Sequence, residues 1–176
     1  MIYMMRGFLA ACLLATPIFA QSLNSKYENV GEFAGNFGET AVVLYSLFDL
    51  EKDRSMVTLR DTAGLASVSV RARKIGDDGD PTNPGVSFTI GPIGAGGDGV
   101  RSDVFYNDVS GYYVSDNDIG GRITLTDYVQ TDTSVSFSVE ATLQPIKRGD
   151  DGFVIDEARS TQVISGTFSG QMTYSD

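Results

Sequence analysis

The sequence contains no histidine and no tryptophan, and its single cysteine, Cys12, lies close to the N-terminus. Without histidine the chain can form no Ser-His-Asp triad and has no imidazole to act as a general base. Ordinary zinc, copper and haem sites are also excluded, because they are built largely from cysteine and histidine. The chemistries that remain are those of carboxylates, tyrosine and lysine, together with metals that oxygen atoms hold, such as calcium.

Basic residues are few as well. The chain has 13 lysines and arginines against 23 aspartates and glutamates, which gives a formal net charge of -10. Nucleic acids and anionic lipid surfaces attract proteins through clustered basic residues. Here the densest basic group, formed by Arg71, Arg73 and Lys74, is followed closely by three aspartates. We therefore expect neither a nucleic-acid partner nor binding to an anionic lipid surface.

The first twenty residues have the features of an export signal. Arg6 precedes an apolar run from Gly7 to Ala20, and Ala20 is a small residue suited to the cleavage position. A bilayer crossing needs about 20 apolar residues, which this run does not reach, and no later segment comes close. We expect residues 1–20 to be a cleaved signal peptide, a periplasmic or extracellular location, and no transmembrane segment.

An alternative is lipidation at Cys12. Leu9-Ala10-Ala11-Cys12 is similar to a bacterial lipobox, in which the cysteine carries the lipid and becomes the new N-terminus. In such signals the hydrophobic region precedes the cysteine, whereas here the apolar run continues well beyond it. We therefore favour ordinary cleavage after Ala20.

The chain after Ala20 has the length of one domain with a single core. Residues 21–39 are polar and rich in glycine, and we interpret them as an N-terminal lead-in. Residues 40–176 form the predicted domain. Removal of the signal leaves no cysteine, so the stability of this domain must come from packing or from bound ions and not from disulfides.

The clearest structural pattern lies between residues 122 and 143. In Ser134–Leu143 polar and apolar residues alternate strictly. This period of two is typical of a strand with one buried face. Residues 122–129 form a second such run. The polar residues 130–133 between the two runs predict a hairpin turn.

Further strands are predicted over residues 56–60, 67–73, 86–90, 102–107, 112–115 and 161–174. Loops are predicted over residues 76–85, 91–99 and 144–159. Residues 40–50 fit either a buried strand or a helix that Asn36 and Glu39 would cap, and we favour the strand because the rest of the chain is β. The predicted fold is all-β, a single antiparallel β-sandwich or barrel-like domain of about eight to nine strands.

Two segments carry a resemblance to other proteins. Gly-Arg-Ile-Thr-Leu-Thr-Asp-Tyr at residues 121–128 and Ile-Ser-Gly-Thr-Phe-Ser-Gly at residues 164–170 resemble uncharacterised secreted bacterial β-sandwich domains that end in a similar strand. The resemblance covers about fifty residues. It implies a β-sandwich fold and an exported protein, and it implies no activity.

Three acidic segments are candidate calcium sites. Calcium is held by several carboxylate and carbonyl oxygens on a turning backbone, and Asp/Gly loops supply both. The same residues are also those that ordinary turns use, and no segment has the spacing of an EF-hand loop. The candidate ligands are Asp77, Asp78, Asp80, Asp116, Asp118, Asp150, Asp151 and Asp156.

Tyr112 and Tyr113 are candidate ligand-binding residues. Carbohydrate-binding sandwiches stack sugars on exposed aromatic rings beside polar groups. The two tyrosines are adjacent, so on a strand one of them must face outward. The alternative is that both are ordinary half-buried strand residues.

The sequence therefore predicts an exported bacterial envelope protein that is a non-enzymatic binding or structural module, without an obligate cofactor. The alternative is a calcium-dependent carbohydrate-binding module, and a more distant one is a hydrolase that uses paired carboxylates. The partner would be an envelope protein or a glycan.

Overall fold

The computed structural model describes residues 22–62, 65–93, 102–115, 119–150 and 152–174. No helix in these ranges is long and apolar enough to cross a membrane. In chain order the strands are β1 (Tyr27–Phe37), β2 (Thr40–Asp49), β3 (Arg54–Ser55), β4 (Val57–Thr62), β5 (Leu65–Ile75), β6 (Pro81–Ile93), β7 (Ser102–Asp108), β8 (Gly111–Ser115), β9 (Arg122–Gln130), β10 (Ser134–Arg148), β11 (Phe153–Ile155), β12 (Gln162–Gln171) and β13 (Thr173–Tyr174).

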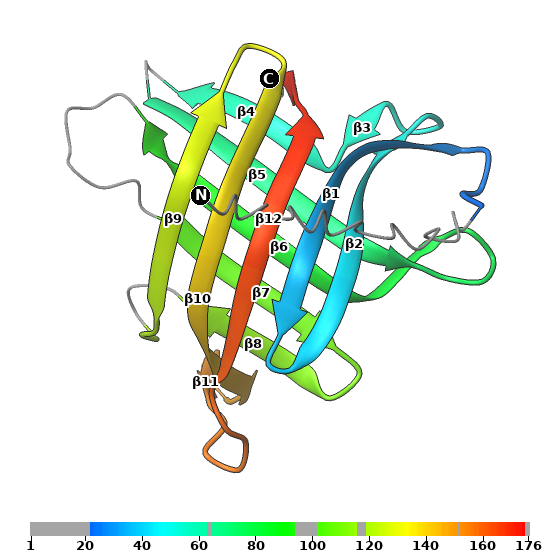
Figure 1. The fold of residues 1–176 in the computed structure, drawn as a ribbon. Coiled ribbons are helices and arrows are strands. Elements are labelled where there is room, and N and C mark those ends of the chain that lie inside the picture. The colour runs from blue at the N-terminus through cyan, green and yellow to red at the C-terminus, as the bar shows by residue number, and fades with distance from the viewer. Residues whose placement is uncertain (1–21, 63–64, 94–101, 116–118, 151, 175–176) are drawn as a thin grey trace, which may run out of the picture.

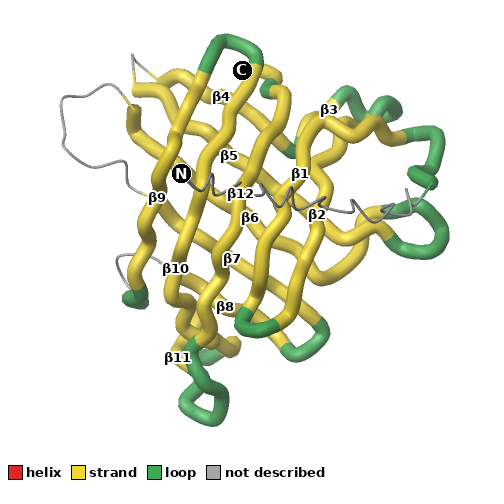
Figure 2. Tube along the Cα trace, in the orientation of Figure 1, coloured by secondary structure: helices red, strands yellow, loops and turns green. Residues whose placement is uncertain are grey.

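The strands form two layers that pack face to face (Figure 1). The front layer contains β9, the first part of β10, β12, β1 and β2, and the back layer contains β4 to β8. Figure 2 shows the strands of the two layers crossing obliquely. Among the described strands every pairing is antiparallel except that of β13 with β4. The predicted all-β class is confirmed, with more strands than the eight or nine expected.

Three links join the layers within the described residues, and one of them is β13, which follows β12 in front and pairs with β4 behind. The long strand β10 belongs to both layers, because residues 134–143 pair with β12 in front and residues 144–146 pair with β8 behind. On the other side β2 pairs with β5 where Tyr45 faces Arg73. The sequence predicted the first part of β10 but placed a connection at residues 144–159. The strand continues because Pro145 and Ile146 are buried where it changes layer, and β11 then folds back on it.

The strand prediction for residues 40–50 is confirmed by β2, in which Val42 and Leu44 face the core. The lead-in predicted for residues 21–39, in contrast, contains β1, which lies between β12 and β2. The alternation of apolar and polar residues is not apparent in this segment, because Gly31 and Gly35 occupy two of the inward positions, where an apolar side chain is expected.

Glycines let β1 and β12 pack closely under aromatic rings. Gly31 faces Gly170, Phe33 faces Phe168, and Gly35 faces Gly166. A Cβ atom added to Gly35 would collide with the Ser165 carbonyl oxygen and lie 2.7 Å from the Gly166 Cα. A Cβ atom added to Gly166 would lie 2.9 Å from the Phe33 ring. These positions therefore admit only glycine, because a neighbouring backbone or ring fills the space of a side chain.

The centre of the core is a group of four phenylalanines. Phe137, Phe168 and Phe33 form one row across β10, β12 and β1. Phe88 of the back layer meets this row, with ring centroids 5.5 Å from Phe33 and 5.2 Å from Phe137. All four are at most 2% exposed. Full burial of one such ring contributes about 1.5–3 kcal/mol, so these contacts between the layers contribute substantially to stability.

A second aromatic contact closes the end of the sandwich near β8. Phe37 stacks on Tyr106 with ring centroids 3.9 Å apart and meets the edge of Tyr113 at 5.0 Å. Burial raises the pKa of Tyr106 to about 12, because the phenolate would lose its hydration there.

The close approach of β1 and β12 predicts the effect of a single methyl group. Gly35→Ala should lower the free energy of unfolding by about 1–3 kcal/mol, because the strands must separate or bend to accept it. Thr167→Ser, on the outer face of the same strand pair, should change it by less than about 0.5 kcal/mol. Urea unfolding followed by circular dichroism measures both, and equal midpoints for Gly35→Ala and wild type would contradict the packing argument.

Candidate functional site

An aromatic patch lies on the outer face of the back layer. We use this name for Phe105 of β7, Tyr112 of β8 and Phe153 of β11. The ring centroids of Phe105 and Tyr112 are 5.4 Å apart, and those of Tyr112 and Phe153 are 6.1 Å apart. Tyr112 is 44% exposed and Phe153 is 54% exposed. Rings that are this exposed can still contact a ligand.

Strand register brings the three rings together. Tyr112 is paired with Asn107 of β7 on one side and with Ile146 of β10 on the other. β11 then adds Phe153 opposite Arg148 at the end of β10. Ile146 and Val114 are buried, although neither belongs to the main core cluster between the layers. Val114 is the register partner of Phe105 and Ile146 that of Tyr112, so these two buried residues lie next to the rings of the patch on the same face of the sheet.

Polar side chains border the aromatic patch and hold one another in place. The Nδ2 of Asn107 donates a hydrogen bond of 2.8 Å to Oδ1 of Asn83, and Nη1 of Arg73 donates one of 3.1 Å to the same oxygen. Asn107 lies directly across from Tyr112. Two amides and a guanidinium in fixed positions beside exposed rings can recognise hydroxyl groups on a ligand that stacks on the rings.

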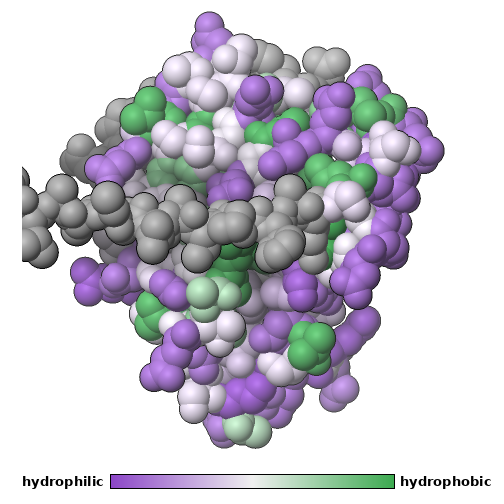
Figure 3. Space-filling view, turned by 45° about the vertical axis from the view of Figure 1, so that its right-hand side comes forward, coloured by the Kyte–Doolittle hydropathy of each residue, from purple (hydrophilic) through white to green (hydrophobic). Residues whose placement is uncertain are grey.

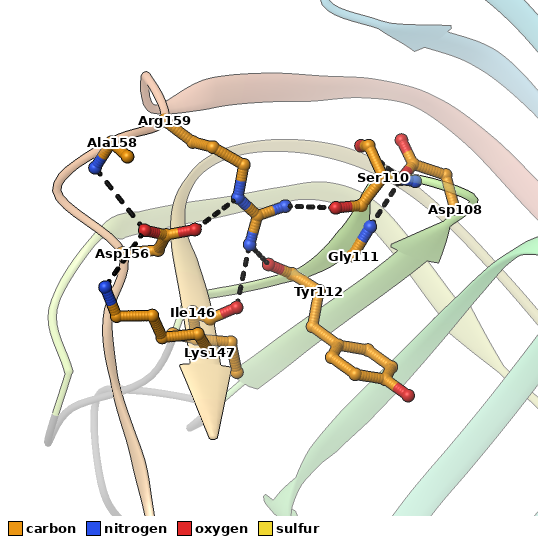
Figure 4. A network of polar contacts seen from close by, with 9 residues as sticks. All are labelled: Asp108, Ser110, Gly111, Tyr112, Ile146, Lys147, Asp156, Ala158 and Arg159. Carbon is orange, nitrogen blue, oxygen red and sulfur yellow. Dashed lines mark hydrogen bonds and ion pairs between the residues drawn. The ribbon is translucent and has the colours of Figure 1, made fainter. Parts of the chain in front are cut away.

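Arg159 fastens the strands that carry the patch (Figure 4). Its guanidinium donates hydrogen bonds to three backbone carbonyl oxygens, those of Ser110 at 3.1 Å, Tyr112 at 3.1 Å and Ile146 at 2.7 Å. The guanidinium carbon also lies 4.8 Å from the ring centroid of Tyr113. One side chain thereby ties the turn between β7 and β8 to β10, and Figure 4 shows the Tyr112 ring pointing away from it.

Asp156 holds Arg159 in this position. Its Oδ2 accepts a hydrogen bond of 2.9 Å from Nε of Arg159, and its Oδ1 lies 3.3 Å from Nζ of Lys147. The bond from Arg159, followed by that from Lys147, keeps the pKa of the Asp156 carboxyl below its ordinary value. Asp156 was predicted as a calcium ligand, and in the structure it is paired with two cationic side chains.

The two predicted ligand-binding tyrosines lie on opposite faces of β8. Tyr112 faces outward in the aromatic patch, whereas Tyr113 is 6% exposed and packs against Phe37 and Arg159 inside the sandwich. Sequence reasoning missed Phe105 and Phe153. Phe153 directly follows an Asp/Gly segment that was interpreted as a connection, so no alternating pattern marked it as part of a strand.

Two of the three acidic candidates of the first segment, Asp78 and Asp80, already have polar partners in the structure. Both Asp80 oxygens lie close to Nζ of Lys26, at 3.1 and 3.2 Å, and Oδ1 of Asp78 accepts a bond of 3.0 Å from the Asp80 backbone N–H. Asp77 and Asp150 are exposed. Asp116, Asp118 and Asp151 lie outside the described residues. Within the described ranges no three acidic side chains gather as a metal site.

The outer face of the front layer is lined with hydroxyl groups. Two open grooves of about 340 and 370 Å³ run over β9, β10, β12 and β1 and share Ser138 and Thr167. Glu32 and Asp127 border the first groove, and Ser138 donates a bond of 3.2 Å to Asp127. Figure 3 shows hydrophilic and neutral residues mixed on the visible side, with hydrophobic areas that are small and separate. The coloured part of this view therefore shows no large continuous apolar area.

The Asp156 contacts predict how stability depends on pH. A carboxyl whose pKa is depressed in the folded state stabilises it above the ordinary value of 3.8, and this contribution is lost as the pH falls through the folded pKa. Asp156→Asn should therefore lower the melting temperature at pH 7 and differ less from wild type at pH 3. Asp150→Asn, at an exposed position, should match wild type at both pH values. Thermal melts at the two pH values measure this. If the difference in melting temperature between Asp156→Asn and wild type were as large at pH 3 as at pH 7, the prediction would be contradicted.

Comparison of the chain with protein-family models, with curated proteins and with solved structures found no match. The aromatic patch and its polar border are therefore the features of the molecule that point to a function.

Proposed function

We propose that this protein is a non-enzymatic binding module of the bacterial envelope, exported by its N-terminal signal, which takes a neutral glycan on the aromatic patch. The supporting observation is the exposure of Tyr112 and Phe153 beside the fixed side chains of Asn107, Asn83 and Arg73. The C–H face of a sugar ring stacks on an aromatic ring, and its hydroxyls bond to amides and guanidinium groups nearby.

The rigidity of the patch supports this assignment. The backbone of Tyr112 is held by the hydrogen bond from Arg159, and its ring contacts the ring of Phe105. Binding costs less when side chains are already ordered, because fewer rotamers are lost when the ligand arrives. Calcium has no part in this proposal, since Asp80 and Asp156 already pair with cationic side chains.

Two observations favour a binding module over an enzyme. The chain has no histidine or cysteine that could act as a base or nucleophile after the signal is removed. The carboxylates that border the grooves of the front layer lie on an open surface, where water is not excluded from a reaction.

A second candidate is a protein partner that docks on β11. This strand exposes three consecutive apolar residues, Phe153, Val154 and Ile155, at 54%, 47% and 45%. Among the described strands it pairs with β10 alone, so its other edge can accept a further strand. Val154 faces away from the aromatic patch, which allows the two candidates to be separated.

Substitutions in the patch test the glycan proposal. Tyr112→Ala and Phe153→Ala should each weaken binding to a neutral polysaccharide at least tenfold, since loss of one stacked ring costs more than about 1.4 kcal/mol. Val129→Ala, a truncation at a 57% exposed position on β9, is the matched control and should bind like wild type. Affinity gel electrophoresis against a panel of neutral polysaccharides, with EDTA present throughout, measures the effect.

The outcome separates the two candidates. The glycan proposal would be overturned if none of the polysaccharides retained the wild-type protein. It would also be overturned if Tyr112→Ala were retained as strongly as the wild type. A partner protein whose capture is lost with Val154→Asp and kept with Tyr112→Ala would favour docking on β11.

A further inference from the structure

A pocket of about 240 Å³ lies away from the aromatic patch, beside the hairpin of β2 and β3. Leu47 and Met56 contribute apolar side chains to its lining, and Tyr27 of β1 contributes an aromatic ring. Figure 1 places β3 beside β2, at the opposite end of the molecule from β8 and β11. Arg71 of β5 lines the pocket and Arg73, two residues further along β5, borders the aromatic patch, but no lining residue of the pocket belongs to the patch or its polar border.

Positive charge surrounds this pocket. Lys52, Arg54 and Arg71 contribute three positive charges and Asp49 contributes one negative charge, so the lining carries a net charge of +2. The whole chain has a formal net charge of -10. The lining therefore has the opposite sign of charge to the chain as a whole, and such a local positive region attracts anions.

Backbone contacts fix the places from which the two arginines extend. The N–H of Arg71 donates a bond of 2.8 Å to the Met56 carbonyl, and its own carbonyl accepts a bond of 2.6 Å from Oγ of Ser46. Arg54 is paired across the hairpin with Asp49. Both arginine side chains thus start from ordered strands on two sides of the pocket.

The one acidic residue is already occupied. Oδ1 of Asp49 accepts bonds from the backbone N–H groups of Glu51 and Lys52 at 3.2 and 3.1 Å, and Oδ2 lies 3.0 Å from Nζ of Lys52. None of the four ion pairs among the described residues includes Arg54 or Arg71. Two guanidinium groups at the pocket therefore lack an anionic partner within the described part of the chain.

We propose that this pocket is a second binding site, which takes a small oxyanion, a single phosphate or carboxylate group, between Arg54 and Arg71. The planar guanidinium presents paired N–H donors that match the oxygens of either group, and Lys52 adds a third positive charge. The volume of the pocket is below the range of about 300–1,000 Å³ that drug-sized ligands occupy, which fits one charged group or a charged monosaccharide. This site is independent of the glycan proposal.

Isothermal titration with two probes, inorganic phosphate and glucuronate, tests the site and distinguishes the two sources of the oxyanion. Ionic strength is held constant with sodium chloride, so that screening does not change between titrations. We expect one of the two probes to bind with one-to-one stoichiometry. Arg71→Gln and Arg54→Gln should each raise the Kd for that probe at least tenfold. Because both arginine side chains are exposed, the two variants should fold like the wild type.

Arg122→Gln is the control, since it removes an equally exposed arginine on β9 and should keep the wild-type Kd. Binding of neither probe to wild type would overturn the proposal, as would a Kd that Arg71→Gln and Arg54→Gln leave unchanged. An equal loss of affinity in all three variants would also overturn it, because it would show attraction by overall charge only. Retention on neutral polysaccharide should stay at the wild-type level in each variant, whatever the anion result.

Discussion

The structure depends on the close packing of β1 against β12, where pairs of glycines alternate with a pair of phenylalanines. A side chain at Gly35 or Gly166 would meet the neighbouring backbone, so the strands approach more closely than ordinary residues allow. The space that the glycines leave is filled by the rings of Phe33 and Phe168. These rings then reach Phe88 and Phe137, and through them the front layer holds the back layer.

The surface features depend on strands that this core positions. β10 passes from the front layer to the back layer, and its second part lies between β8 and β11 and pairs with both. Arg159 then ties Tyr112 and Ile146 together through their carbonyl oxygens. The aromatic patch is consequently built on ordered strands and not on loops, which is the arrangement that binding sites with fixed side chains use.

Sequence reasoning succeeded where a strand has a regular period of two and failed where glycine or proline interrupts that period. The hairpin of β9 and β10 was predicted because apolar and polar residues alternate through residues 134–143. β1 was missed since glycines stand at inward positions, and the end of β10 was missed since Pro145 resembles a break. For the site, the outward orientation of one tyrosine followed from adjacency, but its partners Phe105 and Phe153 lie far away in the chain and meet it only through register.

The sequence by itself determined the all-β class, because the period of two is a local property of each strand. It also determined which chemistries are absent, because composition does not depend on folding. The tertiary structure alone decided which polar groups are paired. Asp80 and Asp156 form ion pairs with lysine and arginine side chains. Arg54 and Arg71 both line one pocket and have no ion-pair partner among the described residues. Such pairing depends on distances between residues of different strands, and the linear sequence does not contain those distances.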